Sequence, residues 1–249
     1  MAKKFLTWQD LYKVEEQLKE NIGCKQRFVL LSKHIKQANI SVGSPQILDG
    51  GGCNFTSLIL KKIFPGSTIV SVNIEGKNDI ADVSIKGDLC DYEKIIKNSQ
   101  IDKFDIIFLG EVFEHIVKPY SVLKNLVKLI KPGGCLIITT PNLANIYNRI
   151  LLLMGHALYN YRPIGIKPNE DHITVVSKKQ MLNLLRNELK LEIITVDGYS
   201  YYERKIINKP KNDFSKSGQK LKIARGLINK VLPVSLREGV LYIAKTSER

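Results

Sequence analysis

Short apolar runs alternate with amphipathic helical segments along most of this 249-residue chain, and this alternation limits the possible folds more than any other feature. Seven runs have the length and composition of strands: 46–49, 67–73, 82–85, 105–109, 135–139, 191–196 and 240–244. The intervening segments with helical spacing of apolar residues are 55–63, 92–97, 120–130 and 178–189. Strands that alternate with helices favour a parallel sheet covered by helices, so the sequence predicts an α/β fold.

The remaining segments flank or interrupt this alternation. Residues 1–45 predict one or two helices, and we expect this N-terminal helical cap to lie at the edge of the sheet. We expect a single domain over 1–249, made of a core at 46–199, a basic helical insertion at 200–238, and the last strand and tail at 239–249. Lys131-Pro132-Gly133-Gly134 predicts the end of a helix before the fifth strand, because proline cannot continue a helix.

Composition excludes several classes of protein. Hydrophobic residues at 44% and charged residues at 25% are close to globular averages, which excludes a disordered or fibrous chain. The apolar run at 150–154 is far shorter than the roughly 20 residues of a membrane-spanning helix. The first residues lack the apolar stretch of a secretory signal, and the four cysteines are widely spaced. We therefore expect a cytoplasmic protein, with membrane association left open.

Positive charge gathers in one segment of a chain whose formal net charge is +14. Residues 204–230 contain nine lysines and arginines and one acid, Asp213, with apolar residues at helical spacing. Such a segment can lie on an anionic membrane surface, contact RNA phosphates, or pack on the domain edge with its lysines in solvent. The sequence leaves these interpretations open, and it does not fix the oligomeric state.

A glycine cluster marks the first candidate site. The strand at 46–49 runs into Gly50-Gly51-Gly52 and then into a helix, and exposed backbone amides at such a turn suit an anionic or polar cofactor. Four further segments follow in order: 69–75, 87–89, 104–115 and 129–142. Taken together, these segments resemble the class I S-adenosylmethionine-dependent methyltransferases over roughly residues 25–200, with 241–245 as a final strand.

The resemblance implies a Rossmann-like seven-stranded sheet, mostly parallel with an antiparallel last strand, and S-adenosylmethionine across the carboxyl ends of the first strands. It implies a set of cofactor-binding residues: Asp49, Gly50, Gly51, Asn73, Glu75, Asp88, Leu89, Gly110 and Glu111. Cys53 and Phe55 depart from the family pattern, since they stand at the second and third glycines of the cofactor loop. Asn73 replaces the acid that grips the ribose, a task that Glu75 can take over.

The run Glu111-x-x-Glu114-His115 places two carboxylates and an imidazole on one side of a helical turn. It resembles the Glu-x-x-Glu-His run of ubiquinone-type O-methyltransferases and of small-RNA 2′-O-methyltransferases. That resemblance implies a divalent ion such as Mg²⁺ on Glu111, Glu114, His115 and His172. In the alternative interpretation no metal is bound, Glu114 caps or braces the next helix, and His115 packs at the rim of the pocket. Separately from the metal, the predicted catalytic residues are His115 as the base, Glu114, and His172 as the reserve base.

The acceptor is predicted by resemblance alone. Residues 140–149 with Asp171-His172 resemble methyltransferases of polysaccharide, lipid-carrier and natural-product assembly. The leading prediction is an S-adenosylmethionine-dependent enzyme that methylates a hydroxyl of a glycan, lipid-linked or small-molecule acceptor. Two alternatives stay open: an RNA 2′-O-methyltransferase with a divalent metal, and a non-catalytic binding protein on the same fold, which the departures at Cys53, Phe55 and Asn73 motivate.

Overall fold

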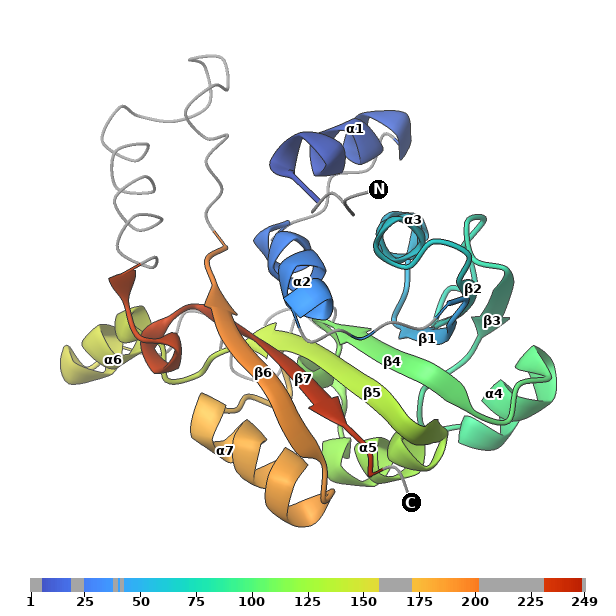
Figure 1. Cartoon of the computed structure of the whole chain (residues 1–249). Helices are drawn as coiled ribbons and strands as arrows, with labels where there is room; N and C mark the ends of the chain where they lie inside the picture. The colour runs from blue at the N-terminus through green and yellow to red at the C-terminus, as the bar shows by residue number, and fades with distance from the viewer. Residues whose placement is uncertain are drawn as a thin grey trace.

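The computed structural model describes residues 6–18, 25–37, 40, 43–156, 172–201 and 231–247. One sheet runs through them in the strand order β3-β2-β1-β4-β5-β7-β6 (Figure 1). Its strands are β1 (Gln46–Gly50), β2 (Thr68–Asn73), β3 (Val83–Lys86), β4 (Phe104–Gly110), β5 (Ile130–Pro141), β6 (Glu192–Tyr199) and β7 (Gly239–Lys245). All pairs are parallel except those of β7, which runs antiparallel to both β5 and β6. The predicted Rossmann-like, mostly parallel sheet with an antiparallel last strand is confirmed.

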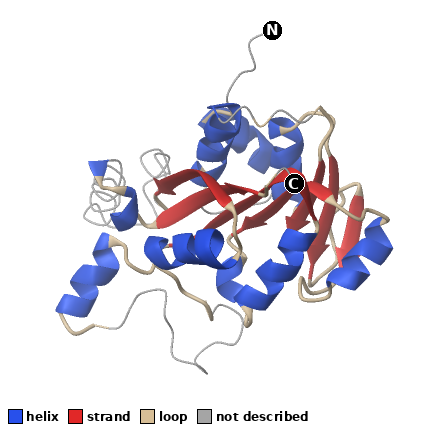
Figure 2. Ribbon diagram, turned by 60° about the horizontal axis from the view of Figure 1, so that its bottom comes forward, coloured by secondary structure: helices blue, strands red, loops and turns tan. Residues whose placement is uncertain are grey.

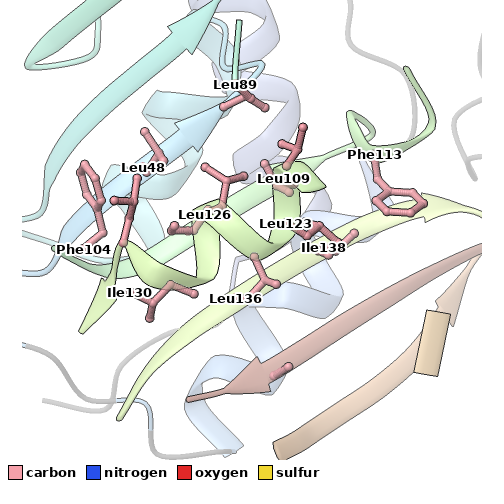
Figure 3. Close-up of a cluster of buried hydrophobic side chains, with 14 of the residues drawn as sticks. Leu48, Leu89, Phe104, Leu109, Phe113, Leu123, Leu126, Ile130, Leu136 and Ile138 are labelled. Atoms are coloured by element: carbon pink, nitrogen blue, oxygen red, sulfur yellow. The ribbon is translucent and has the colours of Figure 1, made fainter. Parts of the chain in front are cut away.

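Helices cover both faces of the sheet (Figure 2). One layer is α1 (Trp8–Leu18), α2 (Gln26–Gln37) and α3 (Asn54–Ile63), and the other is α4 (Tyr92–Ser99), α5 (Pro119–Lys128) and α7 (Lys178–Asn183), which continues as a π-helical turn to Glu188. Strand side chains alternate between the layers, so Ile47 packs with α2 and α3 while its neighbour Leu48 packs with α4 and α5. Figure 3 shows part of the buried apolar cluster that contains Leu48, between the sheet and α5.

The N-terminal helices cover a face of the sheet rather than its edge. Phe28, Leu31 and Ile35 of α2 are buried in one cluster with Ile47 of β1 and Ile243 of β7. The expected edge position was therefore wrong, because the apolar stripe of α2 is wide enough to bury against the strands themselves.

The predicted helix at 120–130 is too long at its C-terminal end. Helix α5 ends at Lys128, and strand β5 already begins at Ile130, which is buried and pairs with Phe104 of β4. The next pair joins Ile106 to Cys135, so residues 131–134 bulge out of the ladder. The proline and glycines thus form a bulge inside a strand instead of a helix stop. No helix among the described residues is long and apolar enough to cross a membrane.

Candidate functional site

The carboxyl ends of the parallel strands meet at one edge of the sheet. Gly50 of β1 pairs with Val72 on one side and with Leu109 on the other, and Gly110 of β4 pairs with Thr139. The strand order reverses between β1 and β4, where connections leave toward opposite faces and a crevice opens in folds of this kind. The predicted cofactor residues that follow β1, β2, β3 and β4 are all brought to this carboxyl edge.

The loop after β1 is built around two glycines. Gly51 has a φ of +70°, and a Cβ atom there would lie 2.4 Å from the Val112 side chain. A Cβ atom on Gly52 would lie 2.3 Å from the Asp49 carboxylate, so no other residue fits without a shift. The Gly51 amide donates to the Val72 carbonyl at 2.7 Å, which holds the loop against β2.

The two departures from the family glycines do not obstruct this loop. Cys53 is the N-cap of α3 with a φ of −124°, an extended conformation that any residue adopts. Phe55 is fully buried between α3 and α2, where its ring centroid lies 5.7 Å from that of Phe28. Its side chain therefore belongs to the core and not to the cofactor crevice, which removes the main reason for a non-catalytic interpretation.

Asn73 fixes the loop through its side chain. Its amide nitrogen donates to the Gly52 carbonyl at 2.9 Å, and its amide oxygen accepts from the Gly76 amide. Glu75 and Asp88 are exposed at the same edge, and the Asp88 carboxylate accepts from the Cys90 amide at 2.8 Å. Leu89 is buried against Gly50. Asn73 therefore positions the backbone of this loop, and the exposed Glu75 follows it two residues later in the chain.

Asp49 is a fully buried acid beneath the loop. Its Oδ2 accepts from the Ser57 hydroxyl at 3.0 Å, whereas its Oδ1 has no hydrogen-bond partner among the described residues. Burial raises the pKa of Asp49 from 3.8 to about 7, although the Ser57 hydrogen bond and the positive charge of Arg27 oppose the shift.

This raised pKa predicts a pH-dependent stability. The folded protein binds the Asp49 proton more tightly than the unfolded chain, so this contribution is complete below pH ~4 and is lost as the pH rises toward 7. In the wild type we expect this effect to lower the free energy of unfolding by on the order of 4 kcal/mol across that range. Asp49→Asn should lack this decrease when urea unfolding is measured at several pH values. The exposed Asp102→Asn is the control, and a pH profile of Asp49→Asn that overlays the wild type would contradict the prediction.

Glu111 lies at the end of β4 with a φ of +60°, a left-handed conformation that is uncommon outside glycine. The hydroxyls of Tyr199 and Tyr201 donate to its two carboxylate oxygens, the second at 2.7 Å. An Nη atom of Arg27 lies 3.9 Å from the same carboxylate. The Arg27 side chain is 8% exposed, and its positive charge also acts on Asp49 and Glu114. A single buried cation thus faces three acids of the carboxyl edge.

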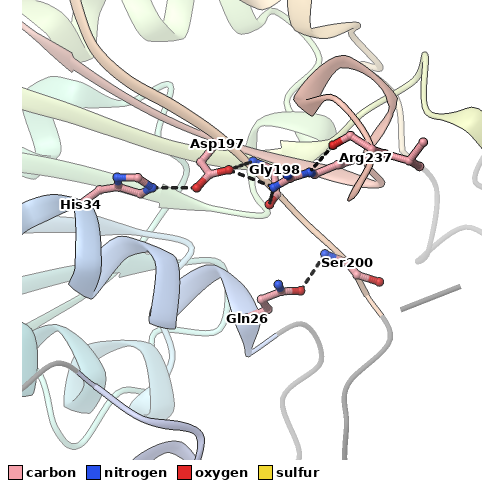
Figure 4. A network of polar contacts seen from close by, with 7 residues as sticks. Gln26, His34, Asp197, Gly198, Ser200 and Arg237 are labelled. Atoms are coloured by element: carbon pink, nitrogen blue, oxygen red, sulfur yellow. Dashed lines mark hydrogen bonds and ion pairs between the residues drawn. The ribbon is translucent and has the colours of Figure 1, made fainter. Parts of the chain in front are cut away.

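Polar contacts fix the end of β6 that carries these tyrosines (Figure 4). The Asp197 carboxylate joins His34 of α2 at 2.8 Å and Arg237 at 3.0 Å. The Ser200 amide donates to the Gln26 side chain at 2.9 Å. Helix α2 and the segment just before β7 therefore hold Tyr199 and Tyr201 over Glu111.

Sequence reasoning missed Arg27, Tyr199 and Tyr201. The signal for the tyrosines is that they end and follow a strand, the same rule that located the other residues of this edge. The sequence signal for Arg27 is weaker than that for the tyrosines. It consists only of a basic residue next to Phe28, which is buried against the sheet.

Glu114, His115 and His172 come together after β4. Glu114 is 1% exposed, and its backbone carbonyl accepts from the amides of Ile173 at 2.8 Å and Thr174 at 2.9 Å, which brings His172 to the site. The two imidazoles meet edge to face with centroids 5.1 Å apart, and one ligand atom from each of the three residues lies within 4.8 Å of the others. Glu111, the fourth predicted ligand, is not part of this group.

The Glu114 carboxyl is electrostatically unusual. Its Oε2 accepts from the Thr140 hydroxyl at 3.3 Å, and its Oε1 has no partner among the described residues. Burial, and next the neighbouring Glu111 carboxylate, raise the pKa of Glu114 well above its usual range. The basic segment 204–230 and Asp171 lie outside the described residues.

Comparisons with known proteins agree with this geometry. Residues 44–196 match the protein family described as "Methyltransferase domain". The chain is 34% identical over 183 residues to the ubiquinone biosynthesis O-methyltransferase of Coxiella burnetii, which covers 70% of this chain and 74% of that protein.

Two solved structures share the fold. A SAM-dependent methyltransferase from Archaeoglobus fulgidus has a TM-score of 0.53 at 15% identity, covering 96% of this chain and 100% of that chain. Phosphoethanolamine N-methyltransferase 2 from Haemonchus contortus, in complex with S-adenosyl-L-methionine, also has a TM-score of 0.53 at 15% identity, covering 97% of this chain and 57% of that chain.

The sheet order, the glycine loop at the carboxyl edge and the family match point to one cofactor and one class of reaction. The cofactor is S-adenosylmethionine, and the chain belongs to the class I S-adenosylmethionine-dependent methyltransferases.

Proposed function

We propose that the chain methylates a hydroxyl oxygen of a small-molecule, lipid-linked or glycan acceptor. The observation that carries this proposal is the position of the exposed His115. It lies three residues after Val112, whose side chain packs against the cofactor loop at Gly51. A hydroxyl must lose its proton as its oxygen attacks the methyl carbon, and histidine is the side chain most often used to take it. The name of the Coxiella burnetii relative, which states O-methylation, supports the same class.

The residues around the crevice suit the three parts of the cofactor. S-adenosylmethionine supplies a methyl group already activated on its sulfonium. The exposed carboxylates of Glu75 and Asp88 would accept from the ribose hydroxyls and the adenine amine. Arg27 would pair with the carboxylate of the methionine part, since it is a buried cation beside the acids of this edge.

His115 would act on the acceptor. Its imidazole accepts the hydroxyl proton, and the edge-to-face contact with His172 fixes the orientation of the ring. Because the methyl group is already activated, the remaining task of the protein is to align the acceptor oxygen with it and to exclude water.

The test is methyl transfer from labelled S-adenosylmethionine to a panel of phenols, sugars and lipid-linked sugars. We expect His115→Asn to reduce the rate roughly 10²- to 10⁴-fold while the affinity for S-adenosylhomocysteine stays the same. The control is His156→Asn, at an exposed histidine outside the group. Unchanged turnover in His115→Asn would reject the base assignment, and methyl transfer confined to nitrogen acceptors would reject O-methylation.

A divalent metal is the second candidate, and the group Glu114, His115 and His172 favours it. The buried, unpartnered Oε1 of Glu114 is the kind of atom that a cation would satisfy. Two imidazoles and one carboxylate suit Mn²⁺, Fe²⁺, Co²⁺ or Zn²⁺ better than Mg²⁺, which prefers oxygen ligands. A bound ion would polarise the acceptor hydroxyl, as expected for an RNA 2′-O-methyltransferase as well.

Chelation separates the two candidates. The metal-dependent function predicts that a chelator abolishes methyl transfer and lowers the thermal midpoint, that Mn²⁺ or Zn²⁺ restores both, and that Glu114→Gln is inactive. Activity that survives chelation in the wild type leaves His115 as the base. RNA oligonucleotides with a 3′-terminal 2′-hydroxyl belong in the acceptor panel, because methylation of these alone would select the RNA function.

A further inference from the structure

We infer that the carboxyl edge of the sheet docks on an anionic lipid surface, with α6 (Ile146–Leu153) as its main apolar contact. The large apolar side chains that are exposed among the described residues all lie in segments at this edge: Ile74, Val117, Tyr120, Ile150, Leu152, Leu153, Met154, Ile173 and Val231. Most of these segments follow β2, β4 or β5. Ile173 precedes α7 and is bonded to Glu114 after β4, and Val231 leads into β7, which starts at this edge because it is antiparallel to β5. The opposite edge has no such side chain in the described part of the chain.

Helix α6 concentrates this exposure. It leaves the carboxyl end of β5 and projects beyond the sheet (Figure 1). Leu153 is 87% exposed, and Leu152 and Met154 are each 58% exposed. Contiguous exposed apolar side chains of this kind mark a surface that contacts something other than water.

A ladder of buried asparagines holds α6 in this position. The Asn142 side chain donates to the carbonyls of Ser235 at 3.0 Å and Arg237 at 2.9 Å. The Asn145 side chain donates to the Asn142 carbonyl at 2.8 Å and caps the helix by accepting from the Asn148 amide. The Asn148 side chain donates to the Leu143 carbonyl at 2.9 Å. The polar side of α6 is therefore anchored to the domain, and its leucines are presented outward by a built structure.

The charge around these side chains selects the occupant. No aspartate or glutamate occurs in the sequence between Glu114 and Glu170, whereas this stretch contains seven basic residues. Two of them are exposed near the apolar side chains, Lys118 before α5 and Arg149 within α6. Apolar side chains that insert among headgroups, with basic residues nearby and no acid in the stretch that carries α6, are typical of peripheral binding to anionic membranes.

A second copy of the chain fits this surface less well. A stable dimer needs about 800 Å² per partner with close packing, whereas the exposed side chains here are spread over several short segments. A lipid surface accepts scattered side chains because each inserts separately. This inference concerns the docking surface alone, and its test does not depend on the acceptor.

The test is cosedimentation of the full chain with phosphatidylcholine vesicles that contain or lack phosphatidylglycerol. We expect binding to require phosphatidylglycerol and to weaken at least about tenfold in Leu152→Ser/Leu153→Ser. Two lysine variants test the orientation: Lys118→Gln, at the carboxyl edge, should weaken binding roughly fivefold. Lys97→Gln removes an equal charge from the exposed far end of α4 and should leave binding unchanged.

Four results would overturn the inference, and the first three concern the vesicles and the oligomeric state. They are no binding of the wild type to either vesicle, equal binding of the leucine variant and the wild type, or a concentration-dependent dimer that the leucine substitutions abolish. Preferential binding to an RNA oligonucleotide in competition with the vesicles would also overturn it. Leu153→Glu alone repeats the test with one change at the most exposed side chain of α6, in case the double variant folds poorly.

Discussion

Phe55→Gly is expected to lower the free energy of unfolding by about 4–6 kcal/mol and to leave cofactor affinity no better than in the wild type. The substitution restores a family glycine, but the Phe55 ring is fully buried in the core beside Phe28. Removing the ring leaves a cavity between α2 and α3, and the glycine weakens the first turn of α3. Urea unfolding and calorimetric titration with S-adenosylhomocysteine measure the two effects.

Cys53→Gly is the matched control for this variant. It restores the other family glycine at an N-cap, where glycine is accepted at a cost below about 1 kcal/mol. A Phe55→Gly protein of wild-type stability that binds the cofactor more tightly would show that the ring faces the crevice.

Arg27→Met is expected to weaken binding of S-adenosylhomocysteine about 100-fold. The guanidinium is buried among three acids, and methionine keeps much of its apolar length while removing the charge. In Arg27→Met the carboxylate of the bound ligand would be buried without its charged partner. This unpaired charge is the reason for the expected loss of affinity.

A ligand comparison distinguishes a direct contact from general damage. 5′-Methylthioadenosine lacks the amino-acid part of the cofactor, so its affinity should change little in Arg27→Met if Arg27 contacts the carboxylate. Arg27→Lys should recover part of the loss. Equal weakening of both ligands would mean that Arg27 only holds Glu111 and its neighbours in place.

The sequence predicted the strands well because apolar periodicity reports burial directly. It misplaced the start of β5, because the pairing of Ile130 with Phe104 is a tertiary contact and Pro132 with two glycines has the local pattern of a helix stop. The direction of Phe55 was predictable in principle, since Ile59 follows it four residues later on the buried side of α3.

The candidate site was predicted to the extent that its residues follow strands. Parallel strands bring such residues to one edge, so Glu75, Asp88 and Glu114 could be located without a structure. Arg27 could not, because its role depends on how α2 packs over the sheet. Tyr201 also follows a strand, but it was missed because β6 runs three residues beyond the predicted end at Val196.

The position of β7 imposes an order on synthesis. It lies between β5 and β6, yet Gly239–Lys245 leaves the ribosome after every other strand. A nascent chain can therefore assemble β1 to β5 while β6 has no partner, and the open edge of β5 stays exposed until β7 has been synthesised. Nascent-chain folding should consequently end in one late step, in which β7 enters the gap and β6 closes the sheet.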